Sequence, residues 1–258
     1  MNKAMSIFST CKCKSIFLLI VSCTVIAFLY SKGQGVSQLK HEKVLQYHAD
    51  WHYLTSKVSQ ELLETRAGLV LNYDELNTYS RKSSRLSKLY LREVDSPSQA
   101  MIYALSSLDA LFVLKNKMLE QYKTKLSIFR NSANYFLYLS KEFKAHLYRY
   151  SDDNTEIEFK INQVLVVINK LNSYDDSKQM DSVFFELKHS GVLVPKDLQH
   201  SFELLLRHGE VLKQTRYDIN EIISNLITLD IENAINHLIT EYKKYYVQQA
   251  TQARFFQI

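Results

Sequence analysis

The sequence predicts an all-α protein, with an N-terminal transmembrane helix followed by an elongated, two-lobed bundle of very long antiparallel helices. Its 258 residues include only 5 Gly and 2 Pro, the residues that most often interrupt helices. Its hydrophobic content of 46% is ample for a buried core. Apolar residues also recur at spacings of three, four and seven over long stretches, which is the period of one helix face.

The transmembrane helix is predicted over residues 15–30, which carry no charge. Sixteen helical residues span about 24 Å, and Lys14 and Lys32 at the two ends can snorkel to the interface. The first 14 residues carry three lysines and no acidic residue, so the positive-inside bias makes 1–14 a cytoplasmic N-terminus. We interpret the segment 15–30 as a signal anchor. A cleavable signal peptide and a lipoprotein processing site at Cys23 stay open.

The rest of the chain divides into a short hinge at 31–35, a first lobe at 36–152 and a second lobe at 153–258. The hinge, SKGQG, has two glycines. Beyond the N-terminal lysines, basic and acidic residues nearly balance, and no basic stripe predicts nucleic-acid binding. All three cysteines lie within the first 23 residues, so the outer part cannot depend on disulfides.

The first lobe is expected to hold two long helices. One covers about 36–92, with an interruption near Asn72. The other starts in DSPSQ, where Ser96 is the expected cap, Pro97 the first helical residue and Gln99 part of a capping box, and it continues to about residue 150. An antiparallel pair joined by a turn at 93–97 would bring together residues whose numbers sum to about 190.

The second lobe is expected to hold shorter helices, since the apolar periodicity breaks more often there. Polar or Gly-containing stretches separate them, and the last helix is expected to kink at LDIEN. The expected helices cover residues 157–171, 180–188, 198–212 and 219 to the C-terminus.

Catalytic motifs are absent from the sequence, so we expect no enzyme activity, no catalytic residues and no cofactor. A periplasmic hydrolase is only a third hypothesis. His48 and His52 are four residues apart, a spacing that can bind a metal, but Ala49 occupies the glutamate position of H-E-x-x-H and no third ligand is evident. We therefore expect two partly exposed helix histidines and no metal site.

Two arginines occupy apolar helix faces. Arg66 and Tyr73 share a face with leucines, and Arg130 lies on an apolar strip beside Asn131; the antiparallel pairing would place the two arginines within about two helical turns. One explanation is structural, with Asp74 or another carboxylate neutralising the arginines and fixing helix register. The other is a pocket whose guanidinium groups recognise a carboxylate or phosphate, with Tyr73 and Asn131 fixing its orientation.

The stretches RAGLVLNYDEL and YKTKLSIFRNSANYF resemble the bacterial DAHL domain, a double all-helical ligand-binding domain. The family pattern runs roughly R-x-G-x-x-x-N-Y-D and later F-K-x-x-N-x-x-x-R-N-S. Two positions depart from it, since Tyr122 replaces the Phe and Leu126 replaces the Asn, which implies an altered ligand preference or a lost site. Gly68 matches the glycine of the pattern, and the resemblance makes the following residues candidates for ligand binding: Arg66, Asn72, Tyr73, Asp74, Lys123, Arg130, Asn131 and Ser132.

The resemblance implies a sensory domain of a bacterial signalling system that feeds a histidine kinase or diguanylate cyclase. The expected location is the bacterial inner membrane, crossed once, with the main domain periplasmic. The expected partners are a small anionic ligand and a second copy or a signalling protein. The residues up to Ile258 include no output module and stop where a second membrane helix is expected, so a stand-alone sensor and a shortened kinase or cyclase both stay open. The rival hypothesis is a membrane-anchored helical scaffold or dimerisation domain.

Overall fold

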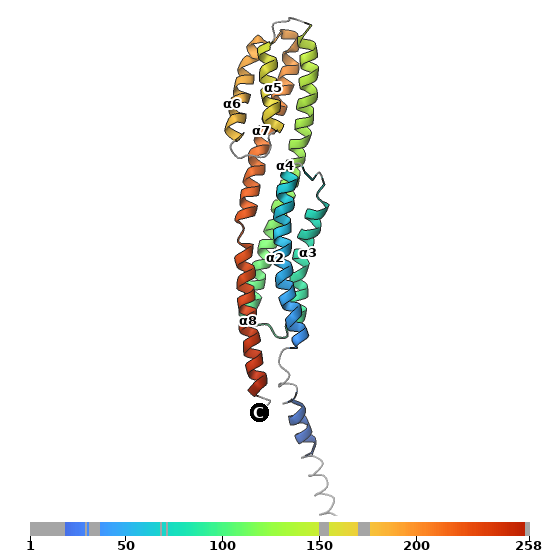
Figure 1. The fold of residues 1–258 in the computed structure, drawn as a ribbon, viewed down its shortest axis with the longest axis vertical. Coiled ribbons are helices and arrows are strands. Elements are labelled where there is room, and N and C mark those ends of the chain that lie inside the picture. The colour runs from blue at the N-terminus through green and yellow to red at the C-terminus, as the bar shows by residue number, and fades with distance from the viewer. Residues whose placement is uncertain are drawn as a thin grey trace, which may run out of the picture. The chain divides into compact units, whose positions relative to one another are not determined.

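The computed structural model describes residues 19–28, 30, 37–67, 69–70, 72–149, 155–169 and 176–255. Among these residues it contains helices and no strands, which confirms the predicted all-α class (Figure 1). Two short 3₁₀ helices, η1 (Ser190–Leu193) and η2 (Lys196–Leu198), precede α7. The α-helices are α2 (Gln38–Arg66), α3 (Asp74–Glu93), α4 (Gln99–Leu147), α5 (Thr155–Asn169), α6 (Asp176–His189), α7 (Gln199–Thr228) and α8 (Ile231–Phe255).

The N-terminal segment is described only at residues 19–28 and 30, which are helical and exposed. Within the described residues, no helix is both long enough and apolar enough to cross a bilayer. The remaining positions of the predicted transmembrane helix, the basic segment 1–14 and the hinge 31–35 lie outside the described residues.

The predicted interruption near Asn72 is confirmed, but the chain reverses direction there, after Arg66, so the prediction of one continuing helix over 36–92 is wrong. The two helices that replace it are antiparallel, as the ion pairs from Lys40 to Asp95 (2.7 Å) and from Lys43 to Glu93 (3.2 Å) show. The first turn of α3 carries acidic residues, which favour a helix start at the positive end of the helix dipole. Apolar periodicity continues on both sides of the reversal, and for this reason spacing alone did not reveal it.

This reversal also corrects the predicted pairing with α4. Helix α3 is antiparallel to α4, with Lys123 Nζ donating to Asn77 Oδ1 at 2.8 Å. Helix α2 instead runs in the same direction as α4, because the Tyr122 hydroxyl donates to the Leu62 carbonyl at 3.2 Å and residues further along both helices also meet. Only the second part of the expected long helix therefore pairs as predicted.

The start of α4 lies close to the predicted position, but its cap is a different residue. The Met101 N–H donates to the Ser98 hydroxyl at 3.2 Å, so Ser98 and not Ser96 caps the helix. Ser96 has a φ of 55°, in the left-handed region, whereas capping residues are usually extended. The restriction that Pro97 places on its preceding residue is consistent with Ser96 lying outside the helix.

The C-terminal helices also differ from the prediction. Helix α7 continues through 213–218, where a break was expected. The interruption predicted at LDIEN is confirmed, as a break between α7 and α8 at residues 229–230. The core face in the expected break is formed by the buried polar residues Thr215 and Arg216. An apolar pattern cannot reveal a face that polar residues continue, and this is the reason for the error.

The described residues group into two compact units. Unit 1 comprises residues up to 52, 85–109 and 232 onward, and unit 2 comprises 53–84 and 110–231. Unit 1 packs an aromatic cluster of Trp51, Tyr90 and Tyr242, whereas the large core of unit 2 includes Phe129 and Phe136. Each unit combines segments that are distant in the sequence but pack together in space. The predicted lobes at 36–152 and 153–258 stay a prediction.

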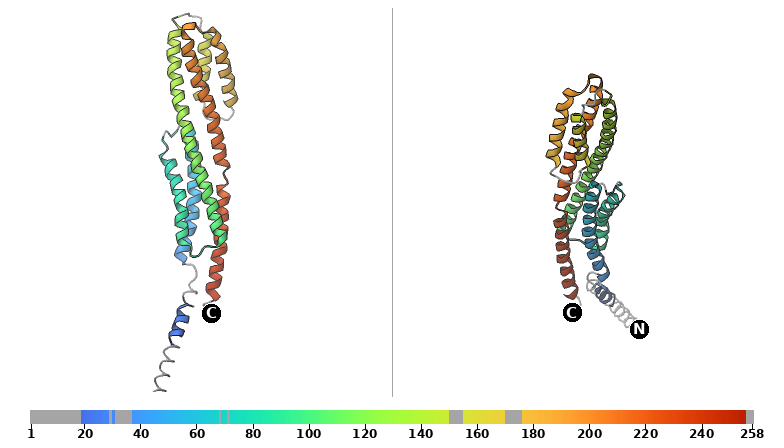
Figure 2. Two further views of the ribbon diagram at one scale, coloured as in Figure 1. Left: turned by 180° about the vertical axis from the view of Figure 1, so that it is seen from behind. Right: turned by 45° about the horizontal axis from the view of Figure 1, so that its top comes forward.

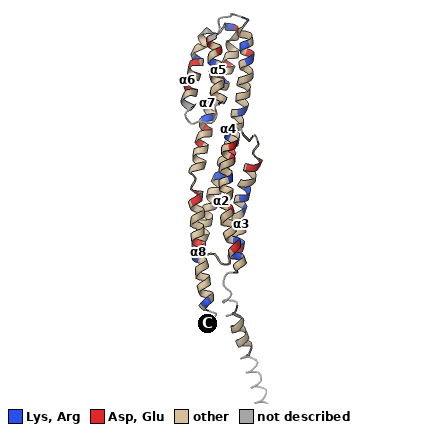
Figure 3. Cartoon of the chain, in the orientation of Figure 1, with Lys and Arg blue, Asp and Glu red and all other residues tan. Residues whose placement is uncertain are grey.

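In unit 2, α4 and α7 lie side by side and antiparallel (Figure 2), with Tyr135 stacked on His208 and Phe143 packed against Phe202. Basic and acidic residues are both scattered along the described helices, and neither sign covers a whole helix (Figure 3). This mixed pattern agrees with the near balance of charge in the sequence beyond the N-terminal lysines.

Candidate functional site

The two arginines that the sequence singled out both lie at the C-terminal end of α2, in unit 2. Arg66, the last residue of α2, donates from Nη2 to Asn220 Oδ1 of α7 at 2.8 Å. Arg130 of α4 donates from Nη2 to the carbonyl oxygens of Thr65 (2.9 Å) and Val70 (3.3 Å). We call Arg66, Arg130 and Tyr73 the arginine layer.

Arg130 has a clear structural effect in this layer. The last carbonyl groups of a helix have no partner within the helix and carry the negative end of its dipole. The Arg130 guanidinium satisfies one of these groups at Thr65 and also holds the loop at Val70. Arg130 therefore fixes the point where α2 ends and the chain turns toward α3.

Tyr73 lies beside this guanidinium, with 6.0 Å between its ring centre and Arg130 Cζ, within the range of a cation–π interaction. Its hydroxyl is buried and has no hydrogen-bond partner among the described residues. A buried hydroxyl without a partner costs about 1–3 kcal/mol, so this group marks a place where an additional acceptor or donor would be favourable.

The other predicted residues lie outside the arginine layer, whose three members are partly buried. Asn72, Asp74 and Asn131 are exposed, and Asp74 forms no ion pair with either arginine within the described part of the chain. Ser132 is buried in the helix packing, at 7% exposure. Gly68, which matches the glycine of the family pattern, lies outside the described residues.

The two departures from the family pattern have structural roles. The hydroxyl of Tyr122, which a phenylalanine would lack, donates to the Leu62 carbonyl of α2 at 3.2 Å. The Tyr122 side chain is fully buried, and this burial raises the pKa of its hydroxyl. Leu126 is also buried and belongs to the core of unit 2.

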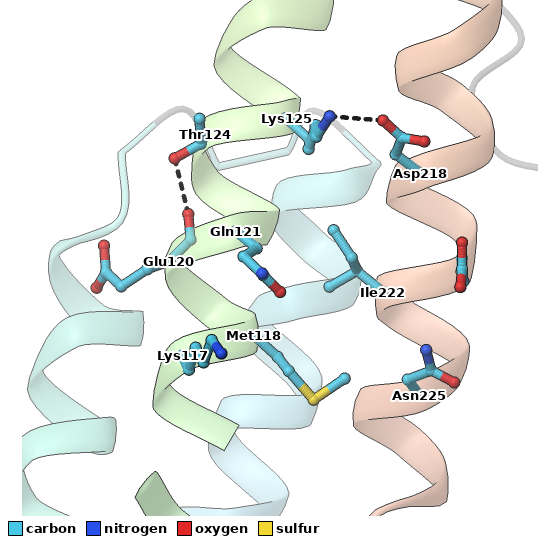
Figure 4. Close-up of a pocket in the computed structure, with 10 residues that line it drawn as sticks. Lys117, Met118, Glu120, Gln121, Thr124, Lys125, Asp218, Ile222 and Asn225 are labelled. Carbon is cyan, nitrogen blue, oxygen red and sulfur yellow. Dashed lines mark hydrogen bonds and ion pairs between the residues drawn. The ribbon is translucent and has the colours of Figure 1, made fainter. Parts of the chain in front are cut away.

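Between α4 and α7 lies a groove that sequence reasoning missed, with a volume of about 680 Å³. Figure 4 shows the ion pair between Lys125 Nζ and Asp218 Oδ2, 2.6 Å apart, and the side chains of Met118 and Ile222. The hydrogen bond from Lys125 lowers the pKa of Asp218. The residues that line this groove are Lys117, Met118, Glu120, Gln121, Thr124, Lys125, Asp218, Glu221, Ile222 and Asn225.

The α4–α7 groove and the arginine layer share a short stretch of α7. Asn220, the partner of Arg66, lies between the groove residues Asp218 and Glu221 in the sequence. A molecule that moved α7 at the groove would therefore also move the acceptor of Arg66. The signal in the sequence was the run of polar residues on α7, but a polar run on an exposed helix face is too common to identify a groove.

Lys123 lies in a second groove, of about 390 Å³, between α3 and α4. Its ammonium group donates to Asn77 and pairs with Glu120. In the same interface between α3 and α4, the Ser80 hydroxyl donates to the Asn116 side-chain carbonyl, and the Asn116 amide donates to Ser84 Oγ at 3.1 Å. Polar residues at 77, 80 and 84 are spaced as one helix face, and this was the available sequence signal.

The fold and the arginine layer define an all-helical bundle with a partly buried polar layer at the end of α2. The family model of the DAHL domain matches residues 36–257, most of the chain. The chain therefore belongs to the DAHL domain family and is a helical sensory domain, as the resemblance predicted. Comparison with curated proteins gave no match, and neither did comparison with solved structures.

Proposed function

We propose that this chain is the extracytoplasmic, ligand-binding input domain of a bacterial signalling protein of the histidine kinase or diguanylate cyclase type. In this proposal residues 15–30 anchor it in the inner membrane and residues 1–14 remain cytoplasmic. Membership of the DAHL family supports the sensory role. The uncharged segment with its preceding lysines supports the anchor and its orientation.

The arginine layer is the observation that carries the ligand-binding part of the proposal. The hydrogen bond from Arg66 to Asn220 uses one of its five N–H donors on a neutral amide, and no carboxylate pairs with Arg66 among the described residues. The Tyr73 hydroxyl beside Arg130 lacks a partner. A small molecule with a carboxylate or phosphate would supply acceptors to these donors, and such charge-assisted bonds are stronger than those to amides.

Ligand binding at this layer would act on the helix ends. An anion that accepts hydrogen bonds from Arg66 and Arg130 competes with Asn220 and with the Thr65 carbonyl. The contact between α2 and α7 then weakens or shifts. A sensor needs an element with two arrangements whose balance the ligand changes, and in this proposal that element is the end of α2.

The test is thermal unfolding of the full chain in a mild detergent against carboxylates, phosphates, amino acids and nucleotides. A ligand at 100 times its dissociation constant stabilises the folded state by about 2.7 kcal/mol, a readily measured rise in Tm. Arg66→Ala and Arg130→Ala should each remove the rise. Arg85→Ala, which removes an exposed arginine of α3, is the matched control and should keep it.

Two results would contradict this assignment. If no compound raises Tm of a well-folded sample, the ligand-binding proposal fails. If a compound raises Tm equally in the wild type and in both layer variants, the ligand binds elsewhere, and the α4–α7 groove is the next site to test. Severe unfolding of Arg66→Ala without ligand would favour the purely structural role of the layer.

A second candidate function is a dimerisation domain, favoured by exposed apolar residues on α4. Val113 and Leu114, adjacent in the sequence, are 69% and 44% exposed. Apolar residues that lie together at a surface often mark contacts with another protein. Sedimentation equilibrium of the full chain in detergent would test this, since Val113→Glu should lower the association constant only if this face joins two copies.

A further inference from the structure

A further groove lies between α6 and α7, within unit 2, and has a volume of about 460 Å³. Small-molecule sites commonly have volumes of about 300–1,000 Å³ and combine apolar walls with a few polar groups. The apolar part of this α6–α7 groove comes from Phe184, Phe185 and Leu206. Phe184 is buried, whereas the Phe185 side chain is 63% exposed. The groove therefore presents an aromatic surface that a ligand can contact.

Helices α6 and α7 are antiparallel along this groove, as two contacts show. Lys213 Nζ of α7 lies 3.3 Å from Asp181 Oδ1 of α6. Further along α6 and further back along α7, Gly209 faces the ring of Phe184. The ion pair therefore marks one end of the groove, and the Phe184 ring lies near its middle.

The other end of the groove carries two cations, Lys188 of α6 and Arg207 of α7. Lys188 lies seven residues beyond Asp181, and Arg207 lies six residues before Lys213, so the antiparallel register places the two cations level to within about one residue. Neither side chain forms a hydrogen bond or an ion pair among the described residues. Like charges repel, and an anion between them would replace this repulsion by attraction.

Both carboxylates of the groove are engaged elsewhere. Asp181 pairs with Lys213, and Glu210 Oε1 lies 3.6 Å from the same ammonium nitrogen. Neither carboxylate pairs with the two cations at the opposite end within the described part of the chain. That end of the groove is therefore positively charged and attracts anions.

We propose that the α6–α7 groove binds a small carboxylate with an aromatic body. The carboxylate accepts hydrogen bonds from Lys188 and Arg207, whose planar guanidinium suits a carboxylate, and the aromatic body lies against Phe185 and Leu206. This site is separate from the arginine layer, since Arg207 lies about 20 Å along α7 from Asn220, which contacts that layer. The inference therefore does not depend on the proposed function.

The experiment titrates 4-fluorobenzoate with the full chain in a mild detergent and follows its fluorine NMR signal, with detergent micelles alone as the blank. We expect the signal to shift and broaden until the site is saturated. Lys188→Met and Arg207→Met each remove one exposed cation and should weaken binding about tenfold or more, because each loses a charge-assisted hydrogen bond. The matched control, Lys141→Met, removes an exposed lysine of α4 in the same unit and should keep the wild-type affinity.

An uncharged ligand with the same ring separates the contribution of the charge from that of the aromatic body. 4-Fluorobenzyl alcohol should bind the wild type about tenfold more weakly than 4-fluorobenzoate, and this difference should shrink in Arg207→Met. Phe185→Ala should weaken the binding of both compounds, since both rings lose the same apolar contact.

Arg66→Ala should bind 4-fluorobenzoate as the wild type does, because it changes only the arginine layer. A loss of binding in Arg66→Ala that spares Lys188→Met and Arg207→Met would place the anion in the arginine layer and overturn the groove proposal. Wild-type affinity in both groove variants would also overturn it. So would a wild-type titration that shows no saturable change beyond the micelle blank.

Discussion

His48 lies among the rings of the unit 1 aromatic cluster. Its ring centre is 5.4 Å from that of Tyr90 and 5.8 Å from that of Tyr242, and the side chain is 4% exposed. Neither ring nitrogen has a hydrogen-bond partner among the described residues. The sequence predicted a partly exposed histidine here, and this prediction is wrong because the His48 side chain is buried. The neutral ring packs as an aromatic residue, and protonating it would place an unsolvated charge in the core.

The first prediction concerns acid stability. Burial, followed by repulsion from His52 and Lys243, lowers the pKa of His48 to about 4, below the ordinary 6.5. Between these values the unfolded chain binds more protons, so the free energy of unfolding falls as pH falls from 6.5 to 4, by about 3 kcal/mol. His48→Phe should remove most of this loss. Urea unfolding at pH 4.5 and pH 7 measures it, and an equal pH dependence in both proteins would contradict the assignment.

The second prediction concerns alkaline stability and the buried Lys115 of α4. The folded pKa of Lys115, about 8, lies below the ordinary 10.5. Between pH 8 and 10.5 the unfolded chain holds more protons than the folded chain, so the free energy of unfolding rises with pH. Below pH 8 Lys115 is protonated in both states and contributes no pH dependence. Lys115→Met should be more stable at pH 7 and should lose the rise. The comparison of urea midpoints at pH 7 and pH 9.5 checks both statements, and a rise that persists in the variant would assign it to other groups.

At the scale of the element, α6 and α7 approach closely at Gly209. A Cβ atom at this position would overlap the ring of Phe184, which is 6% exposed and therefore has little room to move. An alanine here gains up to about 1 kcal/mol of helix propensity but introduces overpacking of about 1–3 kcal/mol. The close approach accounts for a glycine in the middle of a 30-residue helix.

The third prediction is that Gly209→Ala lowers the free energy of unfolding by about 1–2 kcal/mol, because overpacking exceeds the gain in propensity. Phe184→Leu removes part of the ring and serves as the coupling partner. In a double-mutant cycle by urea unfolding, Gly209→Ala should cost less in the Phe184→Leu background. If its cost is unchanged there, the ring contact is not the cause.

The sequence was informative about elements where apolar residues form the packing face, and failed where polar residues do. The periodicity of α4 predicted a helix close to its real bounds, because its core face is almost entirely apolar. On α7 the core face includes the polar residues Thr215 and Arg216, so the apolar pattern stopped there although the helix continues. The reversal after Arg66 was hidden for the opposite reason, since apolar spacing resumes on the far side of the turn.

The sequence predicted the arginines of the candidate site but not the groups that they contact. Arginines on apolar faces pointed to Arg66 and Arg130. Both lie at the end of α2, where Arg130 binds the carbonyl of the residue before Arg66, although the antiparallel pairing used to place them holds for α3 and not for α2. The backbone carbonyls that Arg130 binds and the groove between α4 and α7 depend on three-dimensional contacts, and no spacing in the sequence encodes these.

At the scale of the whole molecule, α2, α3 and α4 contribute residues to both compact units. Helix α2 passes from unit 1 to unit 2 at residues 52–53, and α4 does so at 109–110. A helix interior resists local breaks, because each interruption must be followed by renewed and costly nucleation. Unfolding in one unit should therefore propagate along these helices to the other.

The fourth prediction is that the two units unfold in one transition. Trp51, the only tryptophan, is fully buried in unit 1, so its fluorescence reports on that unit, whereas circular dichroism reports on all helices. Phe136→Ala in the core of unit 2 should cost about 3 kcal/mol. If the shared helices couple the units, this variant lowers the urea midpoint by fluorescence and by circular dichroism equally. A fluorescence midpoint that keeps its wild-type value, while circular dichroism shows an earlier transition, would mean that each unit unfolds on its own.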